Sequence, residues 1–133
     1  MMKPLILISH GNLCLELKKS VEMIMGPQEE IYTVTLQPEE GQAEFLQKFK
    51  ETIADIDEFV VFADLYGGTP CNVAAKMLLS GSNFKLYTGM NMAMIIDYLN
   101  AALLDTKPDP IKGGTQGICD VNASLQKLDG EDE

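Results

Sequence analysis

A strand-like segment followed by a helix-like segment recurs four times along this chain, and this alternation constrains the fold most strongly. Four short apolar or β-branched runs predict the strands, at residues 5–9, 31–36, 59–63 and 84–88. Helical spacing is clearest after the first run, at Leu13, Leu17, Val21 and Ile24. Helical crossovers of this kind connect parallel strands. The sequence therefore predicts a single-domain, doubly wound, mostly parallel four-stranded α/β sheet in the order 2-1-3-4, with helices on both faces.

Turn and cap signals set the boundaries of these segments. Gly26 and Pro27 end the first helix. Thr69 is predicted to cap the third helix, with Pro70 at its first position. After the fourth helix, prolines and glycines predict a loop over residues 105–117. Residues 118–121 are predicted to form a short fifth strand, and the pattern leaves its pairing partner open.

The length and charge of the chain limit the number of its domains and the partners it can bind. Its 133 residues, 46% of them hydrophobic, suit one domain, which we place at residues 1–128. Acidic side chains crowd the end of the chain, so we expect an acidic, flexible tail at residues 129–133. The net charge of −10 argues against nucleic acid or an anionic membrane as a partner, because both need a basic surface.

Targeting signals and cysteine usage predict a cytoplasmic protein. The apolar run near the start is too short for a signal peptide, and no stretch is long enough to cross a bilayer. The three cysteines include no close-spaced pair, which is typical of reduced thiols.

The only histidine of the chain, His10, follows the first buried strand, and Asp64 follows the third. In the order 2-1-3-4 these two strands are neighbours, about 5 Å apart, and their carboxyl ends flank the point where such sheets bind ligands. We therefore expect the two side chains to meet. A carboxylate that accepts a hydrogen bond from one imidazole nitrogen leaves the other nitrogen free as a nucleophile.

Gly67, Gly68 and Thr69 enter the third helix beside this pair and predict an anion-binding turn. The N-terminus of a helix stabilises a bound anion by only about 0.3–2 kcal/mol. Residues 5–14 and 62–75 contain no lysine or arginine, so a free phosphate would bind poorly. A phosphoryl group attached to His10 needs only orientation, which this turn could give.

Other interpretations of these residues stay open. A lone histidine is more often structural, and a Gly-Gly pair is usually only a turn. Cys14 and Cys71 each fall in the first turn of a helix near His10, so they could bind zinc or supply a reactive thiol. They could equally be small buried side chains, and no ligand-pair spacing supports a metal, so we expect neither metal nor cofactor.

Three motifs, in this order along the chain, resemble the motifs of a known family. They are Ser9-His10-Gly11, the block from Asp64 to Asn72 with the sequence DLYGGTPCN, and Gly89-Met90-Asn91-Met92. Over about residues 5–104 the chain resembles the enzyme IIA component of the mannose-type (mannose, fructose, sorbose) sugar phosphotransferase system (PTS).

The resemblance implies a role for each site residue. The phosphorylated histidine of the family falls on His10, its orienting aspartate on Asp64, and the hydroxyl that receives the phosphoryl oxygens on Thr69, beside Gly67 and Gly68. The family takes a phosphoryl group from phospho-HPr and passes it to a IIB component, which acts with the membrane components IIC and IID. No fused IIB follows here, so we expect IIB to be a separate chain.

The family also implies a homodimer that exchanges an antiparallel C-terminal strand, here residues 118–121. It usually has a helix before that strand, where this chain has Pro108 and Pro110. Two related functions are alternatives: the phosphoryl-donor subunit of a dihydroxyacetone kinase, and a regulatory domain that is phosphorylated on histidine.

Overall fold

Four parallel strands form the sheet, in the predicted order β2-β1-β3-β4. The computed structural model describes residues 2–131. The strands are β1 (Leu5–His10), β2 (Ile31–Leu36), β3 (Val60–Ala63) and β4 (Lys85–Tyr87). β1 pairs with β2 from Leu5↔Ile31 onward and with β3 from Leu5↔Val60 onward, so the carboxyl ends of the strands lie at one edge.

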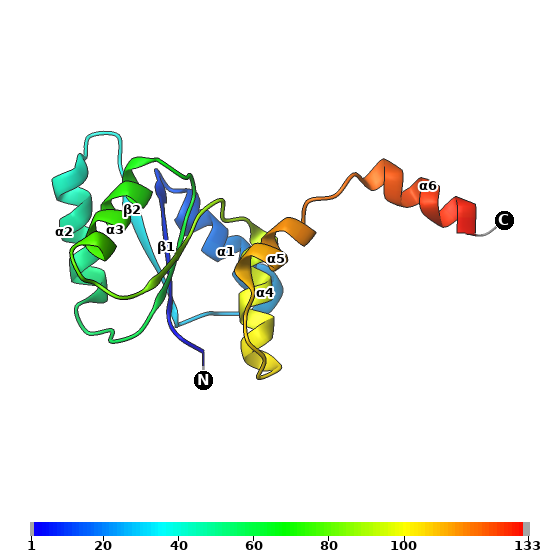
Figure 1. Cartoon of the computed structure of the whole chain (residues 1–133), viewed down its shortest axis with the longest axis horizontal. Coiled ribbons are helices and arrows are strands. Elements are labelled where there is room, and N and C mark those ends of the chain that lie inside the picture. The colour runs from blue at the N-terminus through cyan, green and yellow to red at the C-terminus, as the bar shows by residue number, and fades with distance from the viewer. Residues whose placement is uncertain (1, 132–133) are drawn as a thin grey trace.

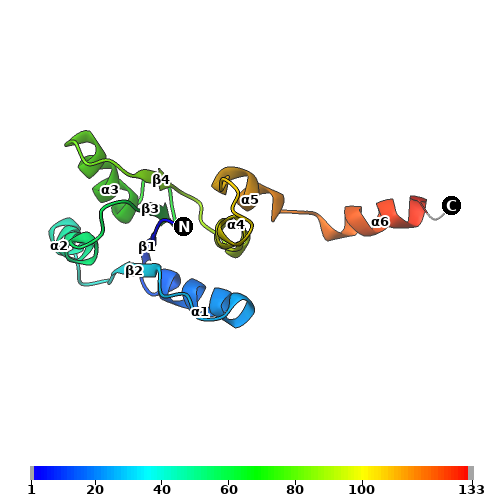
Figure 2. The ribbon, with the colours of Figure 1, turned by 90° about the horizontal axis from the view of Figure 1, so that it is seen from below.

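Two helices cover each face of the sheet (Figures 1 and 2). α1 (Leu13–Met25) and α4 (Met92–Leu103) pack on one face, and α2 (Gln42–Ile53) and α3 (Thr69–Leu79) pack on the other. Each of these helices follows a strand, so each begins near the carboxyl edge of the sheet. None of the helices formed by residues 2–131 combines the length and the apolarity that crossing a bilayer requires.

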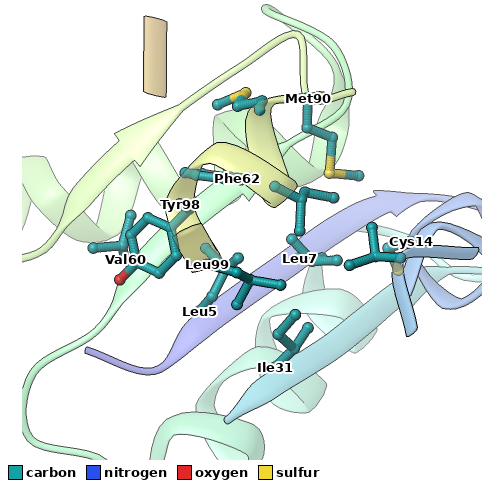
Figure 3. Packing of buried hydrophobic residues seen from close by; sticks show 12 residues of the cluster. Leu5, Leu7, Cys14, Ile31, Val60, Phe62, Met90, Tyr98 and Leu99 are labelled. Atoms are coloured by element: carbon teal, nitrogen blue, oxygen red, sulfur yellow. The ribbon is translucent and has the colours of Figure 1, made fainter. Parts of the chain in front are cut away.

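Alternating strand residues divide the core into two clusters. On the side of α1 and α4, Leu5, Leu7 and Phe62 pack with Tyr98 and Leu99, as Figure 3 shows. On the side of α2 and α3, the neighbouring strand residues pack with a group of aromatic rings. Central strands that are buried on both faces read as continuous apolar runs, which is why the first and third strands were plain in the sequence.

The predicted loop over residues 105–117 is wrong, because α5 (Pro110–Gln116) forms there and packs on α4. Asp109 caps it by accepting a hydrogen bond from the Lys112 N–H at 3.2 Å, and Pro110 takes a first-turn position. The glycines let α5 approach α4 closely: a Cβ at Gly113 would lie 2.6 Å from the Asp97 Cβ. They serve helix packing, whereas the sequence pattern suggested a turn.

The predicted fifth strand does not form within a single copy of the chain, and its exchange between two copies stays a prediction. Residues 118–120 have no regular structure, and Val121 begins α6 (Val121–Glu131). Asp120 directs the chain into this helix, because its carboxylate accepts from the Ala123 N–H at 3.2 Å. α6 extends away from the body (Figures 1 and 2) and crosses the proposed boundary at residue 128. The rest of the expected tail, Asp132 and Glu133, lies outside the described residues.

Candidate active site

His10 and Asp64 lie side by side at the carboxyl edge of the sheet. His10 is the last residue of β1 and Asp64 directly follows β3. The Nδ1 of His10 is 2.8 Å from the Asp64 Oδ2, and the His10 backbone N–H donates to the same oxygen at 2.9 Å. One carboxylate oxygen thus fixes both the backbone and the ring of the histidine.

This contact sets the proton position on the ring. An ionised carboxylate only accepts hydrogen bonds, so Nδ1 carries the proton and Nε2 presents its lone pair. The His10 side chain is 47% exposed, whereas that of Asp64 is 11% exposed. The ring is therefore accessible to an incoming group, while its orienting partner is largely sheltered from solvent.

The second oxygen of Asp64, Oδ1, is buried and has no hydrogen-bond partner among residues 2–131. Leaving a buried acceptor unpaired costs free energy. A loss of folding free energy of this kind is expected at a site whose residues are placed for a reaction and not for stability.

Ser9 holds the turn that follows His10, and the sequence reasoning gave it no separate role. Its Oγ accepts from the Cys14 N–H at 2.9 Å and donates to the Gly11 carbonyl at 3.2 Å, and the side chain is fully buried. The Gly11 N–H donates to the Leu36 carbonyl at 2.7 Å. The sequence signal that could have identified this role is a hydroxyl side chain in an otherwise apolar strand.

Gly67 has a backbone φ of +83°, which glycine adopts without strain. Its carbonyl accepts from the Asn72 side-chain amide at 3.1 Å. Asn72 therefore braces the loop from the first turn of α3, a contact that the sequence reasoning did not identify.

Gly68 lies directly against the histidine ring. A Cβ at this position would be 2.6 Å from the His10 Cε1 and 3.3 Å from its Nε2. The Gly68 N–H donates to the Leu65 carbonyl at 3.1 Å, which closes a turn. Gly68 thus shapes the site mainly by leaving room for the ring, since its N–H is already engaged.

Thr69 does not cap α3, so that prediction is wrong. The helix begins at Thr69, its N-cap is Gly68, and no side-chain hydrogen bond caps it. The capping position has moved back by one residue because Gly68 already has the extended backbone that a cap needs. The Thr69 hydroxyl is thereby free of the cap role, beside a helix start whose first N–H groups lack intrahelical acceptors.

Cys14 and Cys71 do not converge. Cys14 belongs to the core cluster on the α1 and α4 face, and Cys71 belongs to the cluster on the opposite face. Burial raises the pKa of the Cys14 thiol. Within residues 2–131, no group of three or more His, Cys, Asp or Glu side chains is placed to hold a metal ion.

This arrangement can perform nucleophilic chemistry at Nε2. The ring is oriented by a carboxylate, partly exposed to solvent, and adjacent to a helix N-terminus that favours negative charge. The positive charge that develops on the ring after attack is stabilised by Asp64.

The chain is similar in sequence to one family model and to several known proteins. The sequence matches the EIIA-man family, described as "PTS system fructose IIA component", over residues 4–110. It is 28% identical over 96 residues to the mannose-specific EIIAB component of Escherichia coli K12, which covers 70% of this chain and 30% of that protein. It is 28% identical over 98 residues to the fructose-specific EIIA component of Bacillus subtilis, which covers 71% of this chain and 67% of that protein. The chain thus spans about three tenths of the Escherichia coli relative.

Solved structures share the fold. A phosphotransferase system EIIA from Streptococcus agalactiae superposes with a TM-score of 0.80 at 25% identity, covering 92% of this chain and 99% of that one. The mannose/sorbose-specific IIA subunit from Enterococcus faecalis gives a TM-score of 0.75 at 28% identity, covering 90% of this chain and 95% of that one.

Proposed function

The chain belongs to the family of mannose-type PTS IIA components, and on this premise we propose that it carries a phosphoryl group on the Nε2 of His10 between two partner proteins. The observation that supports this most directly is the 2.8 Å contact between Nδ1 and Asp64, which occupies Nδ1 and leaves Nε2 of a half-exposed side chain as the nucleophile.

The donor in this proposal is phospho-HPr. Nε2 of neutral His10 attacks the phosphorus in line, a P–N bond forms, and the bond to the donor nitrogen breaks and returns its electron pair to the donor ring. The product ring of His10 keeps its proton on Nδ1 and carries positive charge, which the Asp64 carboxylate stabilises. The phosphoryl group then leaves to the acceptor, and His10 returns to the neutral form.

Residues at the start of α3 orient the phosphoryl group. In this proposal the Thr69 hydroxyl and the backbone around Gly67 receive its oxygens, while Gly68 keeps the ring in place. Transfer between two nitrogen or similar nucleophiles needs no metal or other cofactor.

The acceptor in this proposal is a IIB component, which passes the group toward a sugar through the membrane components IIC and IID. The protein would act in the cytoplasm, where phospho-HPr and IIB meet.

We further propose that the protein works as a homodimer. The residues 121–130 of α6 are all exposed, and the helix projects from the body (Figure 1). Isolated helices of this length are marginal in water, so α6 is expected to pack against a second copy.

The test is intact-mass analysis after incubation with phosphoenolpyruvate, enzyme I and HPr. We expect a gain of one phosphoryl group that is lost in acid. Because the chain has a single histidine, His10→Gln must abolish the gain. Absence of the gain in a folded wild-type protein, with HPr shown to be phosphorylated, would contradict the proposal.

Asp64→Ala tests the orienting role separately. It removes a charge-assisted hydrogen bond worth about 1.5–3 kcal/mol, so phosphorylation should slow by about 10- to 100-fold without being abolished. Asp55→Ala, another loop aspartate but one outside the site, is the matched control and should phosphorylate at the wild-type rate. An Asp64→Ala rate equal to wild type would remove Asp64 from the mechanism.

A further inference from the structure

A cavity of about 370 Å³ lies at the amino edge of the sheet, at the opposite end of the strands from His10. Its lining includes Lys3, which precedes β1, and the first residues of β3 and β4, Val60 and Lys85. The end of α4 forms another wall, because this helix runs back to the edge where the chain begins (Figure 1). Cavities of this size hold small organic molecules. Nothing in the reaction at His10 uses it.

The floor of the cavity is apolar and aromatic. Val60, Tyr98 and Ala101 line it and are buried, and the Tyr98 ring belongs to the core cluster that Figure 3 shows. The Tyr98 hydroxyl already donates to the Lys3 carbonyl at 2.8 Å. The floor therefore offers a surface for an apolar ring and leaves polar recognition to the mouth of the cavity.

Basic side chains gather at this cavity. Lys3, Lys85 and Lys107 all line it and are exposed, and they are three of the ten basic residues in a chain of net charge −10. Within residues 2–131, none of the three forms an ion pair with an acidic side chain. Three unpaired ammonium groups from separate segments make this a locally positive site that attracts anions.

The turn after α4 directs Lys107 along the cavity. Asp105 has a φ of 53°, and among residues 2–131 it is the one residue other than glycine with a positive φ. Its N–H donates to the Ala102 carbonyl at 3.3 Å, and the Thr106 N–H donates to the Ala101 carbonyl at 2.8 Å. Glycine usually occupies this position in such a helix end. Here Asp105 instead adds one carboxylate to a lining that holds three lysines.

We propose that this cavity binds a small organic anion that combines an apolar ring with a single acidic group, such as a carboxylate. The ring packs on the floor formed by Val60 and Tyr98, and the acidic group lies among the lysines at the mouth. An inorganic anion would leave the apolar floor unused, and a neutral ring would leave the lysines unpaired. The site is remote from His10, so the inference does not depend on the proposed function.

The test is a titration of the isotopically labelled full chain, followed by the NMR shifts of its backbone amides. The probe is 1-naphthoate, which has both features. The comparison compounds are 1-naphthol, which keeps the ring without the charge, and acetate, which keeps the charge without the ring. We expect saturable binding of 1-naphthoate, about tenfold or more tighter than that of either comparison compound. The shifting amides should be those of residues 85–87 and 105–107, while the amides of His10 and Gly68 stay unmoved.

Charge variants should change the affinity in opposite directions. Lys85→Gln and Lys107→Gln should each weaken 1-naphthoate binding by about two- to fivefold, as expected for an exposed ion pair. Asp105→Asn removes the negative charge but keeps a residue that tolerates positive φ, so it should tighten binding by about the same factor. Lys50→Gln is the matched control, because Lys50 is exposed on α2, on the other face of the sheet. It should bind like wild type.

Ala102→Trp tests the cavity itself. Ala102 is exposed on α4 and lines the cavity, so an indole there should fill the space for the ring while the lysines remain. This variant should bind 1-naphthoate no more tightly than acetate. Wild-type binding of 1-naphthoate that is no tighter than that of acetate would overturn the proposal, because the lysines alone would explain it. Amide shifts centred on His10, or an Ala102→Trp variant that binds like wild type, would overturn it as well.

Discussion

Gly68 must be glycine because the histidine ring occupies the space where a side chain would begin. Its backbone has φ −76° and ψ 165°, which alanine also adopts without strain. A Cβ would lie 2.6 Å from the His10 Cε1, so the ring must move. Since misplacing a reacting group by about 1 Å can cost about 100-fold in rate, Gly68→Ala should slow phosphorylation by about that factor, measured by quenched-flow intact mass.

Gly67→Ala and Gly81→Ala are the comparisons for this variant. Both glycines have positive φ, and neither would place a Cβ against another atom. Each should lose about 1–2 kcal/mol of unfolding free energy, while Gly68→Ala should unfold like wild type. Wild-type phosphorylation by Gly68→Ala would refute the steric role.

The pairing of His10 with Asp64 could be predicted from the sequence, but the reason for Gly68 could not. The two residues stand at the carboxyl ends of β1 and β3, which are neighbours in the predicted strand order. Both residues directly follow recognisable apolar runs. The Gly68 contact depends on the direction of a loop in space. The same is true of Ser9 and Asn72, whose hydrogen bonds join residues only within the folded turns.

At the scale of elements, the packing of α5 on α4 depends on small residues. A Cβ at Gly113 would lie 2.6 Å from both the Cβ and the Cγ of Asp97, and the Cβ cannot rotate away. Gly113→Ala should therefore force the helices apart and cost about 1–3 kcal/mol, measured as a lower midpoint of urea unfolding.

Gly130→Ala is the control for this packing effect. Gly130 lies in α6, and a Cβ there would meet open space. Alanine favours a helix over glycine by about 1 kcal/mol, so this variant should gain helicity without losing stability. Equal stability of Gly113→Ala and wild type would contradict the close-packing role.

The elements that cover the sheet were predictable, and those beyond residue 104 were not. The first four helices carry an apolar face at helical spacing, because they pack on the sheet. α5 packs through glycines instead, and its Pro110 stands at a helix start. Among residues 2–131, α6 makes no extensive contact with another element, so its place could not be predicted from packing on the sheet.

At the scale of the whole molecule, Tyr98 makes stability depend on alkaline pH. It lies in the core on α4, and its hydroxyl donates to the Lys3 carbonyl at 2.8 Å, which ties the start of the chain to α4. Burial, with a smaller contribution from Tyr87, raises the pKa of Tyr98 to about 12. The folded state therefore holds this proton more tightly than the unfolded state, whose tyrosines ionise near pH 10.

Stability should accordingly fall as the pH rises from about 10 to about 12, and Tyr98 should contribute about 1–2 kcal/mol of that fall. Tyr98→Phe should lose about 1 kcal/mol at pH 8 through the missing hydrogen bond, and its stability should then fall less steeply above pH 10. Urea unfolding of both proteins at pH 8, 10 and 11 measures the difference. Equal slopes would show that Tyr98 does not carry this dependence.

The C-terminal segment, residues 118–133, should determine whether the protein is a dimer without affecting the phosphorylation of His10. Val121, Leu125 and Leu128 are exposed and repeat at helical spacing along one side of α6, which projects away from the body (Figure 2). If a second copy covers this face, removing residues 118–133 should convert a dimer to a monomer by light scattering. His10 should still be phosphorylated within twofold of the wild-type rate. Leu125→Asp with Leu128→Asp in the full chain should reproduce the monomer, because charged side chains cannot be buried there without a large free-energy cost. A truncated protein that keeps the mass of the full-length assembly would place the dimer contact elsewhere.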